Sequence, residues 1–270
     1  MQRFLVCSPE YYDSTFMFNP WMNYNESVDF DLARAQWDRA IEALTEAGAE
    51  VEYLAPSPYS PAQVFTADGA VVLDNRHALL LRNDGPRGTL EPRYFAEWLR
   101  SDGFTVESIP PNRSIDGGNV LRLHDGSLAC GLKPGSDGSS EKYLERILEL
   151  TEGAKLYRFQ LVDRKFLHLD MALGKIGNDA YLVFEPAFED GLISLKSTPA
   201  MKKPIITVSQ NDAEQFACNG VTVGNTFFTG MVSQSLIDSI EGLGYRAVTL
   251  DMSEFHKAGG GLKCLTLPLN

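Results

Sequence analysis

Five side chains in this sequence could together carry out covalent chemistry on a cationic carbon: Cys264, His168, Asp68, Asp116 and Asp170. A thiolate is a nucleophile, and an imidazole can serve as acid and base near neutral pH. Carboxylates gathered in one pocket favour a bound cation, and a planar guanidinium pairs with carboxylates bidentately. If these residues meet, they predict attack by a thiolate on the carbon of a guanidinium or amidine.

Each of these residue types also has an ordinary structural explanation. A single cysteine is more often a small buried hydrophobic side chain, which is our interpretation of Cys7, Cys130 and Cys218. Asp68 and Asp116 each precede a glycine and could be plain turn residues. The chemical interpretation therefore depends on whether the elements around these residues bring them together.

Four hairpin patterns recur along the chain, at 69–82, 119–132, 170–185 and 220–230. Each has Asn, Asp or Gly near its centre, residue types that tolerate the positive φ of tight hairpin turns. An amphipathic helix, a glycine stop and a further strand follow the hairpins, although the helix after 170–185 is shorter and less regular. The pattern predicts a ββαβ unit repeated with a period of about fifty residues.

A fifth unit is divided between the two ends of the chain. CLTLPL at 264–269 supplies its first strand and QRFLVCSP at 2–9 its second, and a helix and strand follow at 29–50 and 51–56. Pairing of the first and last strands would close a ring without exposed sheet edges. We therefore expect an α/β fold of five ββαβ repeats in a single domain over residues 1–270, rather than an ordinary α+β domain.

In a closed ring, equivalent positions of the repeats gather around the central axis. The positions at which the first strands begin hold Asp68, Asp116, His168 with Asp170, Asn219 and Cys264. Core packing does not explain this set, because buried charges are costly unless they are paired. The repeats therefore predict one site at one end of the axis.

Composition and charge narrow the classes of binding partner that the chain can have. The chain has 270 residues, a formal net charge of −12 and no cluster of Lys and Arg of the kind that binds nucleic acid. No apolar run approaches the ~20 residues that a membrane span needs. The four cysteines are scattered without metal-binding spacing, which favours free thiols, no metal site and a cytoplasmic location.

Five segments carry a resemblance to a known superfamily: FNPWMN at 18–23, VFTAD at 64–68, DGGNV at 116–120, FLHLDM at 166–171 and HKAGGGLKCLTLPL at 256–269. With these, nearly the whole chain resembles the guanidino-group-modifying (pentein) superfamily. That superfamily includes arginine deiminases, dimethylarginine dimethylaminohydrolases, amidinotransferases and the cyanobacterial arginine dihydrolase. The resemblance implies a five-bladed, pseudo-symmetric α/β propeller and hydrolysis through a covalent cysteine intermediate, without metal or cofactor.

The resemblance also implies roles for single residues. Cys264 is the nucleophile, and His168 protonates the departing amine and then activates water. Asp116 orients His168 or the substrate. Asp68 and Asp170 hold the guanidinium.

Three further residues are implied as substrate contacts. Asn19 is expected near the pocket mouth, and Arg82 and Arg87 lie where relatives place an arginine on the substrate carboxylate. The HLD motif resembles deiminases, dihydrolases and amidinotransferases, whereas dimethylargininases usually lack its carboxylate. Asp68 instead matches deiminases and dimethylargininases, because the arginine dihydrolase has Asn there.

These features predict a hydrolase acting on a C–N bond of arginine or an N-substituted arginine, as arginine deiminase and dimethylargininase do. An amidinotransferase, which passes the same intermediate to an amine, is the alternative. A third hypothesis is a non-catalytic propeller such as the ribosome anti-association factor, against which Cys264 and His168 argue. The expected partner is an arginine-like small molecule, with no nucleic acid and no membrane, and a homodimer is left open.

Overall fold

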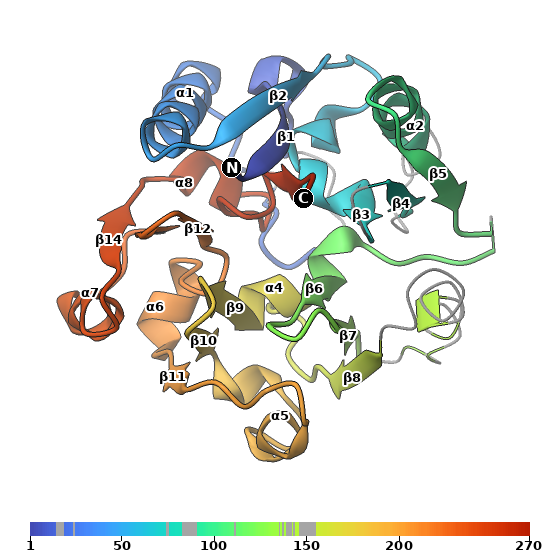
Figure 1. Cartoon of the computed structure of the whole chain (residues 1–270). Coiled ribbons are helices and arrows are strands. Elements are labelled where there is room, and N and C mark those ends of the chain that lie inside the picture. The colour runs from blue at the N-terminus through green and yellow to red at the C-terminus, as the bar shows by residue number, and fades with distance from the viewer. Residues whose placement is uncertain are drawn as a thin grey trace. The chain divides into compact units, whose positions relative to one another are not determined.

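The computed structural model describes the chain except for residues 15–18, 24, 74–75, 83–90, 111, 135, 137, 139–141, 143 and 146–154. Figure 1 follows the chain by colour from the N-terminus to the C-terminus. The chain divides into two compact units. Unit 1 comprises Met1–Gly117 and Met252–Asn270, and unit 2 comprises Gly118–Asp251.

The described strands form five three-stranded sheets with one shared plan. In every sheet the middle strand is antiparallel to the first strand and parallel to the third. A parallel connection needs a crossover, which the segment between the second and third strands supplies. Five repeats of this strand plan, as the hairpin pattern predicted, are therefore present, and in four of them a described α-helix lies between the second and third strands.

Unit 1 holds two of these sheets, ordered β15-β1-β2 and β3-β4-β5. Its strands are β1 (Arg3–Cys7), β2 (Glu50–Leu54), β3 (Ala70–Val72), β4 (His77–Leu80), β5 (Thr105–Ser108) and β15 (Leu267–Pro268). Its helices are α1 (Phe30–Glu46), α2 (Glu91–Ser101) and α8 (Ser253–His256), with short 3-10 helices η1 (Pro9–Tyr11), η2 (Pro61–Val64) and η3 (Thr66–Asp68). A further 3-10 helix, η4 (Gly117–Asn119), spans the boundary between the units in the sequence.

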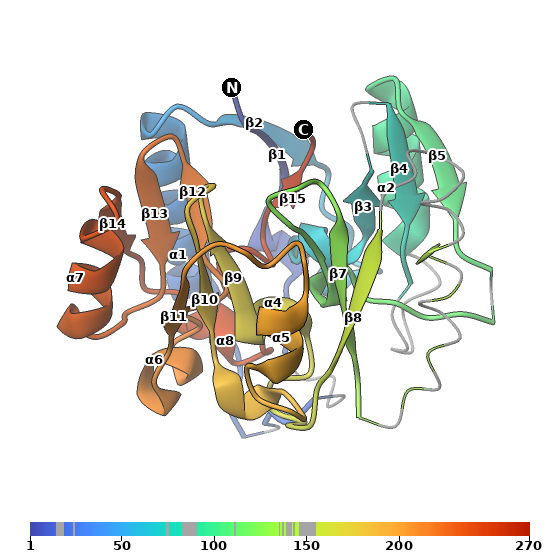
Figure 2. The ribbon, with the colours of Figure 1, turned by 60° about the horizontal axis from the view of Figure 1, so that its bottom comes forward.

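The two ends of the chain meet in unit 1, where β1 pairs with β15 in antiparallel register. Figures 1 and 2 both show the N- and C-termini side by side. Leu5 on β1 and Leu267 on β15 are buried in one hydrophobic cluster together with Phe95 of α2. The predicted pairing of the first and last strands is thus confirmed.

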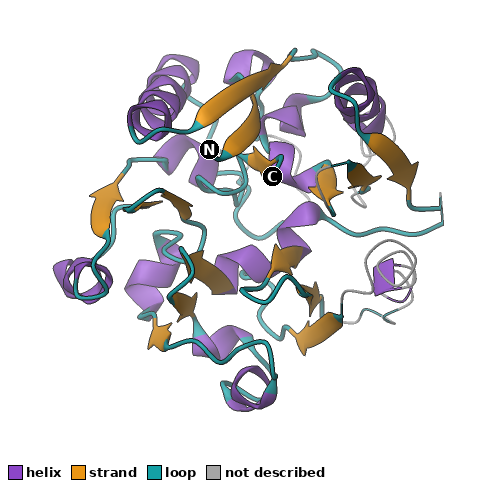
Figure 3. Ribbon diagram, in the orientation of Figure 1, coloured by secondary structure: helices purple, strands orange, loops and turns teal. Residues whose placement is uncertain are grey.

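Unit 2 holds the other three sheets, ordered β6-β7-β8, β9-β10-β11 and β12-β13-β14. Its strands are β6 (Val120–Arg122), β7 (Leu128–Leu132), β8 (Leu156–Gln160), β9 (Leu173–Ile176), β10 (Ala180–Val183), β11 (Ile205–Thr207), β12 (Val221–Val223), β13 (Thr226–Thr229) and β14 (Arg246–Thr249). Its helices are α4 (Leu169–Ala172), α5 (Ile193–Ser197), α6 (Gln210–Glu214) and α7 (Gln234–Glu241), with the 3-10 helix η5 (Glu185–Ala187). The alternation of strands and helices is clearest in Figure 3.

The hairpin turns of unit 2 follow the expected chemistry. Gly126, Gly177 and Gly224 all have positive φ, at 87°, 49° and 56°. Only glycine reaches that region without strain from a Cβ atom, which is why glycine occupies these turn positions. The turn expected at Asp74 and Asn75, and most of the helix expected after the second hairpin, lie outside the described residues.

The first strands are shorter than the sequence suggested. CLTLPL was expected to be a strand from Cys264, but β15 begins at Leu267, because residues 262–265 form turns. In the third repeat, residues 169–172 form helix α4 before β9 starts. In both places backbone hydrogen bonds within the turn replace those of a ladder. The predicted site residues therefore sit in the segments that enter the sheets rather than on the strands.

None of the described helices is both long and apolar enough to span a membrane.

Candidate active site

The segment that carries Cys264 is a run of turns on the way into β15. Leu265 N donates to Leu262 O at 3.2 Å, and Thr266 N donates to Lys263 O at 3.1 Å. The Cys264 side chain is buried, with an exposed fraction of 2%. Its carbonyl oxygen accepts a hydrogen bond from Ala67 N at 3.1 Å, so the turn of Cys264 is joined to the segment that holds Asp68.

Thr66 fixes that junction, and sequence reasoning missed it. Its hydroxyl donates to Leu5 O at 2.8 Å and accepts from Leu267 N at 3.1 Å. The residue is fully buried. One side chain thus ties η3, which ends at Asp68, to both β1 and β15. Its position two residues before Asp68 in VFTAD was the only available signal.

Asp116 lies beside the same junction. A Cβ atom added to its neighbour Gly117 would lie 1.7 Å from the Ala67 carbonyl oxygen and 3.1 Å from the Asp68 Cα. This contact requires glycine, because real Cβ atoms do not approach so closely. Asp116 is itself buried, with an exposed fraction of 4%. Unit 1 therefore brings together the segments of three predicted residues: Cys264, Asp68 and Asp116.

Arg82 is anchored by its backbone just before Asp116. Arg82 and Ile115 exchange two hydrogen bonds of 3.2 and 3.0 Å, and the Ser114 hydroxyl donates to Arg82 O at 3.0 Å. The Arg82 side chain is half-buried. Arg87, the second arginine expected to contact the substrate carboxylate, lies outside the described residues.

The glycine segment before Cys264 begins as the end of helix α8. Gly259 has a φ of 81°, Gly259 N donates to His256 O at 2.9 Å, and Gly260 N donates to Phe255 O at 3.2 Å. This pair of bonds with a left-handed glycine is a Schellman cap. A Cβ on Gly260 would lie 2.2 Å from Phe65. The two glycines are thus required by backbone geometry and close packing, and the mobility of this loop stays a prediction.

Asn19 holds the N-terminal segment against the same loop. Its amide nitrogen donates to Ala258 O at 2.9 Å, and its amide oxygen accepts from Trp21 N at 2.9 Å. An amide group offers two N–H donors and two lone pairs. These bonds therefore leave one donor and one acceptor position on the Asn19 amide. Asn19 can thus position the loop and still contact a substrate, as the sequence predicted.

In unit 2, His168 and Asp170 share one neighbour. A Cβ on Gly118 would lie 2.7 Å from His168 Nδ1 and 3.1 Å from Asp170 Oδ1. His168 occupies the N-cap position of α4 and is half-buried, while Asp170 is in the first turn of that helix and is 1% exposed. Because both side chains pack on one bare backbone position, Gly118 sets their spacing.

Two asparagines hold the HLD segment: Asn219, which the repeats place at the predicted site but for which the sequence predicts no role, and Asn119, which sequence reasoning missed. Asn119 Oδ1 accepts from Leu169 N at 3.2 Å, and Asn219 Nδ2 donates to Asp170 O at 3.4 Å. Both side chains are buried, with exposed fractions of 2% and 1%. Asn219 begins the fourth repeat and Asn119 follows DGG, so their repeat phase was the signal available in the sequence.

The remaining thiols fit a structural role. Cys7, Cys130 and Cys218 are buried and are not joined in disulfides. Burial raises the pKa of the Cys218 thiol, and the nearby charge of Asp170 raises it further. A thiol that resists ionisation is a poor nucleophile. Among the described residues, no group of three or more His, Cys, Asp and Glu side chains is arranged to hold a metal ion.

The five three-stranded repeats and these segments define a class: the proteins of the pentein fold, to which the structures matched below belong. A model of the family described as N,N-dimethylarginine dimethylhydrolase, eukaryotic, matches residues 11–270. The chain therefore belongs to the N,N-dimethylarginine dimethylhydrolase family.

Relatives carry two kinds of name. The chain is 33% identical, over 98% of its length, to the bifunctional arginine dihydrolase/ornithine cyclodeaminase AgrE of a Nostoc species, of which the match covers 37%. It is 26% identical, over its whole length, to the dimethylarginine dimethylaminohydrolase of Mycobacterium tuberculosis, of which the match covers 86%. The chain thus spans little more than a third of the bifunctional protein.

A solved structure matches from end to end. The N-terminal domain of ArgZ, covalently bound to a reaction intermediate, superposes with a TM-score of 0.91 at 29% identity, covering 100% of this chain and 98% of that one. The same domain, as a cysteine-to-serine variant, has also been solved with its substrate bound. These are properties of ArgZ, and they place this chain beside a domain that forms a covalent intermediate.

Proposed function

We propose that this chain is a cysteine-dependent hydrolase that attacks the guanidinium carbon of arginine or an N-substituted arginine. The observation that carries the proposal is the packing of the DGGN segment. Gly117 packs on the backbone of Ala67 and Asp68 in unit 1, and Gly118 packs on His168 and Asp170 in unit 2. Two consecutive glycines thus pack against the segments that carry the proposed guanidinium-binding Asp68 and the proposed acid His168. The likeness to an ArgZ domain with a covalent intermediate supports the same assignment.

The proposed first half of the reaction forms a bond from the Cys264 sulfur to the guanidinium carbon. Asp68 and Asp170 hold the guanidinium by its N–H groups, and their charge keeps it cationic. His168 gives a proton to the departing nitrogen as its C–N bond breaks. Ammonia or an amine leaves, and a thiouronium remains on Cys264.

In the second half, His168 takes a proton from water, and the water oxygen bonds to the same carbon. The C–S bond then breaks, so the electron pair returns to sulfur and the thiolate is regenerated. The product is a urea, such as citrulline from arginine. Asp116 orients His168 or the substrate, and Asn19 and Arg82 or Arg87 contact the rest of the substrate.

Two features give opposite indications about the substrate. Asp170, in the HLD motif, favours an unsubstituted guanidinium, because N-methylation removes a donor and adds bulk. Asp68 instead matches the deiminases and dimethylargininases, which stop after one hydrolysis. The relatives named above act as an arginine dihydrolase and as a dimethylarginine dimethylaminohydrolase. We place arginine first and methylated arginines second.

Turnover assays test the proposal directly. The purified chain is incubated with arginine, methylated arginines, agmatine and guanidinoacetate, each with and without an amine acceptor. A urea-type product with ammonia or an amine, formed without an acceptor and abolished by Cys264→Ser, is the expected result. Product that requires the acceptor would replace hydrolysis with amidino transfer. A biological activity that Cys264→Ser leaves intact would support the binding-only propeller instead.

The assembly is part of the same proposal. The five sheets close into a propeller, and both units belong to one catalytic domain over residues 1–270. End-to-end superposition on the ArgZ domain supports this arrangement. Independence from metals and cofactors, a cytoplasmic location and a homodimer stay predictions, and the first is checked by assaying the enzyme with a chelator present.

A further inference from the structure

Unit 2 contains a basic pocket that the proposed reaction does not use. Its cavity of about 730 Å³ is lined by the turn between β6 and β7, the start of β8 and the loop between α5 and β11. The charged lining residues are Arg122, Lys155, Lys202, Lys203 and Asp125. Four cations face one carboxylate here, in a chain whose formal net charge is −12. A local concentration of positive charge in an acidic chain indicates a site for an anion.

His124 lines this basic pocket, and its ring packs against the fully buried ring of Tyr181 with the two planes tilted by 58°. The His124 and Tyr181 rings lie 4.4 Å apart, and the Tyr181 hydroxyl accepts from His124 N at 3.3 Å. That hydroxyl also donates to Ala200 O at 3.4 Å. Tyr181 thus links the β6–β7 turn to the loop that carries Lys202 and Lys203, so the two cationic walls are held in place by one buried side chain.

The single carboxylate is already engaged within its own turn. Asp125 accepts hydrogen bonds from the backbone N–H and the hydroxyl of Ser127. Lys155, Lys202 and Lys203 are exposed, and none of them forms an ion pair with another described residue. The backbone of Lys155 is fixed beside the turn, because Leu128 N donates to Lys155 O at 2.9 Å. The lysine charges are therefore available to a ligand.

A fifth cation lies next to the pocket. Burial lowers the pKa of Lys175, and the nearby Arg122 charge lowers it further. The pKa of His124 is also lowered, first by burial and then by the charge of Lys175, with a smaller effect from Lys203. Burial is the larger cause of both shifts, and repulsion between neighbouring cations adds to it; a bound anion would relieve that repulsion.

We propose that this basic pocket binds a small molecule that carries a di- or triphosphate. Lysine is a compact point charge suited to phosphate, whereas carboxylates are best matched by the fork of an arginine. The cavity volume is in the range of about 300–1,000 Å³ that holds a small ligand. An extended polyanion such as nucleic acid would be repelled by the acidic remainder of the chain.

The basic pocket is distinct from the His168 segment of the same unit. His168 and Asp170 precede β9, whereas the pocket forms at the β6–β7 turn and the loop before β11. The inference therefore does not depend on the proposed function, and substitutions in the pocket are expected to leave basal turnover unchanged.

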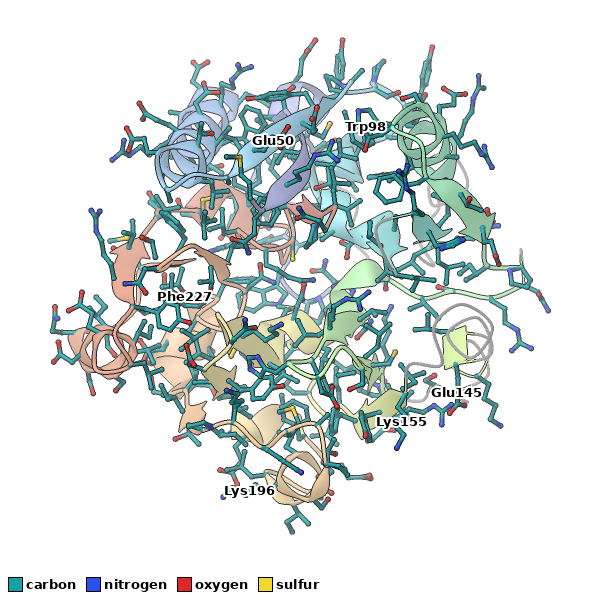
Figure 4. All side chains as sticks on the ribbon, viewed as in Figure 1. Glu50, Trp98, Glu145, Lys155, Lys196 and Phe227 are labelled. Carbon is teal, nitrogen blue, oxygen red and sulfur yellow. The ribbon has the colours of Figure 1, made fainter. Side chains whose placement is uncertain are left out.

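Binding of pyrophosphate and of ATP to the full chain, measured by calorimetry near physiological ionic strength, tests the proposal. Saturable binding to one site is expected, and Lys202→Glu with Lys203→Glu should weaken it by about tenfold or more. The matched control is Lys142→Glu with Lys196→Glu, because these exposed lysines do not line the pocket and the change in net charge is the same. Figure 4 labels Lys155 at the pocket and Lys196 on α5.

Three results would overturn the proposal. The first is the absence of saturable pyrophosphate binding. The second is an equal loss of affinity in the control variant, which would show a general charge effect. The third is citrate binding as tightly as pyrophosphate, which would remove the preference for phosphate. All substituted residues are exposed, so unchanged thermal unfolding of the variants is expected and shows that they fold.

Discussion

Gly117 and Gly118 are consecutive residues without side chains, and each packs against a different group of predicted site residues. Gly117 faces the carbonyl oxygen of Ala67, and the backbone N–H of Ala67 donates to Cys264 O. Gly118 faces the His168 imidazole and the Asp170 carboxylate. A methyl group at either position would displace its neighbours, so the proposed site requires glycine at both.

Gly118→Ala is predicted to impair turnover more than folding. Its Cβ would lie 2.7 Å from His168 Nδ1, so the imidazole must shift. Displacing an acid–base group by a fraction of an ångström to 1 Å can cost up to about 10²-fold in rate. We expect kcat to fall by at least about tenfold, equivalent to ~1.4 kcal/mol.

The control for that prediction is Gly242→Ala, in unit 2 at the end of α7. Gly242 has an ordinary right-handed φ of −61°, and an added Cβ would lie 3.2 Å from Asp238 O. Its kcat should match that of the unsubstituted enzyme. Equal activity of Gly118→Ala and Gly242→Ala would show that Gly118 does not set the His168 position.

His124 gives a second residue-scale prediction, for stability against pH. Its pKa is lowered from 6.5 in the folded chain by burial and by Lys175, with a smaller effect from Lys203. The unfolded chain therefore binds this proton more readily, and the free energy of unfolding falls as pH drops below 6.5 toward the folded pKa. Urea unfolding between about pH 8 and about pH 5 should show this loss, and His124→Asn should reduce it. Identical pH profiles for the two proteins would contradict the prediction.

At the scale of elements, the first strand of each repeat enters its sheet through a segment that carries a predicted site residue. Asp68 ends η3 before β3, His168 caps α4 before β9, and Cys264 lies in the turns before β15. These short helices and turns shorten the strands. The predicted site residues therefore lie in segments whose backbone hydrogen bonds are local. Side chains such as Thr66, Asn119 and Asn219 hold these segments in place.

Thr66→Val is predicted to destabilise unit 1, because it leaves Leu5 O and Leu267 N without the hydroxyl that bonds both. An unsatisfied buried backbone group costs about 1–3 kcal/mol. We expect a lower melting temperature by several degrees together with lower activity, since Thr66 holds η3 beside Cys264. Thr66→Ser keeps the hydroxyl, so it should stay close to the unsubstituted protein in both measurements. If Thr66→Ser loses as much as Thr66→Val, the methyl group rather than the hydroxyl is responsible.

At the scale of the whole molecule, the repeats were predictable and the clusters between repeats were not. The hairpins could be predicted from turn residues such as Gly126 and Gly224. The division of the fifth repeat between the chain ends could be predicted from CLTLPL and QRFLVCSP. Both signals are local in the sequence. The basic pocket joins Arg122 to Lys203, which are far apart in sequence, so no run of charge marks it. Thr66 was missed for the same reason, because its partners are Leu5 and Leu267.

The pairing of the two chain ends yields the last prediction. Removing residues 267–270 deletes β15, and with it Leu267 and Leu269, which are 2% and 1% exposed. Burying a leucine stabilises a protein by about 1.5–3 kcal/mol, so the deletion should cost roughly 3–6 kcal/mol in the free energy of unfolding.

A circular permutant tests whether pairing or chain order matters. Asn270 Nδ2 donates to Met1 O at 2.8 Å, so a short linker can join the ends. The new ends are opened between Asp190 and Gly191, in a turn where Asp190 is exposed. The permutant should unfold near the melting temperature of the parent, whereas the deletion should not. A permutant that loses as much stability as the deletion would show that the β1–β15 pair is not sufficient and that continuity of the chain at residue 190 is also needed.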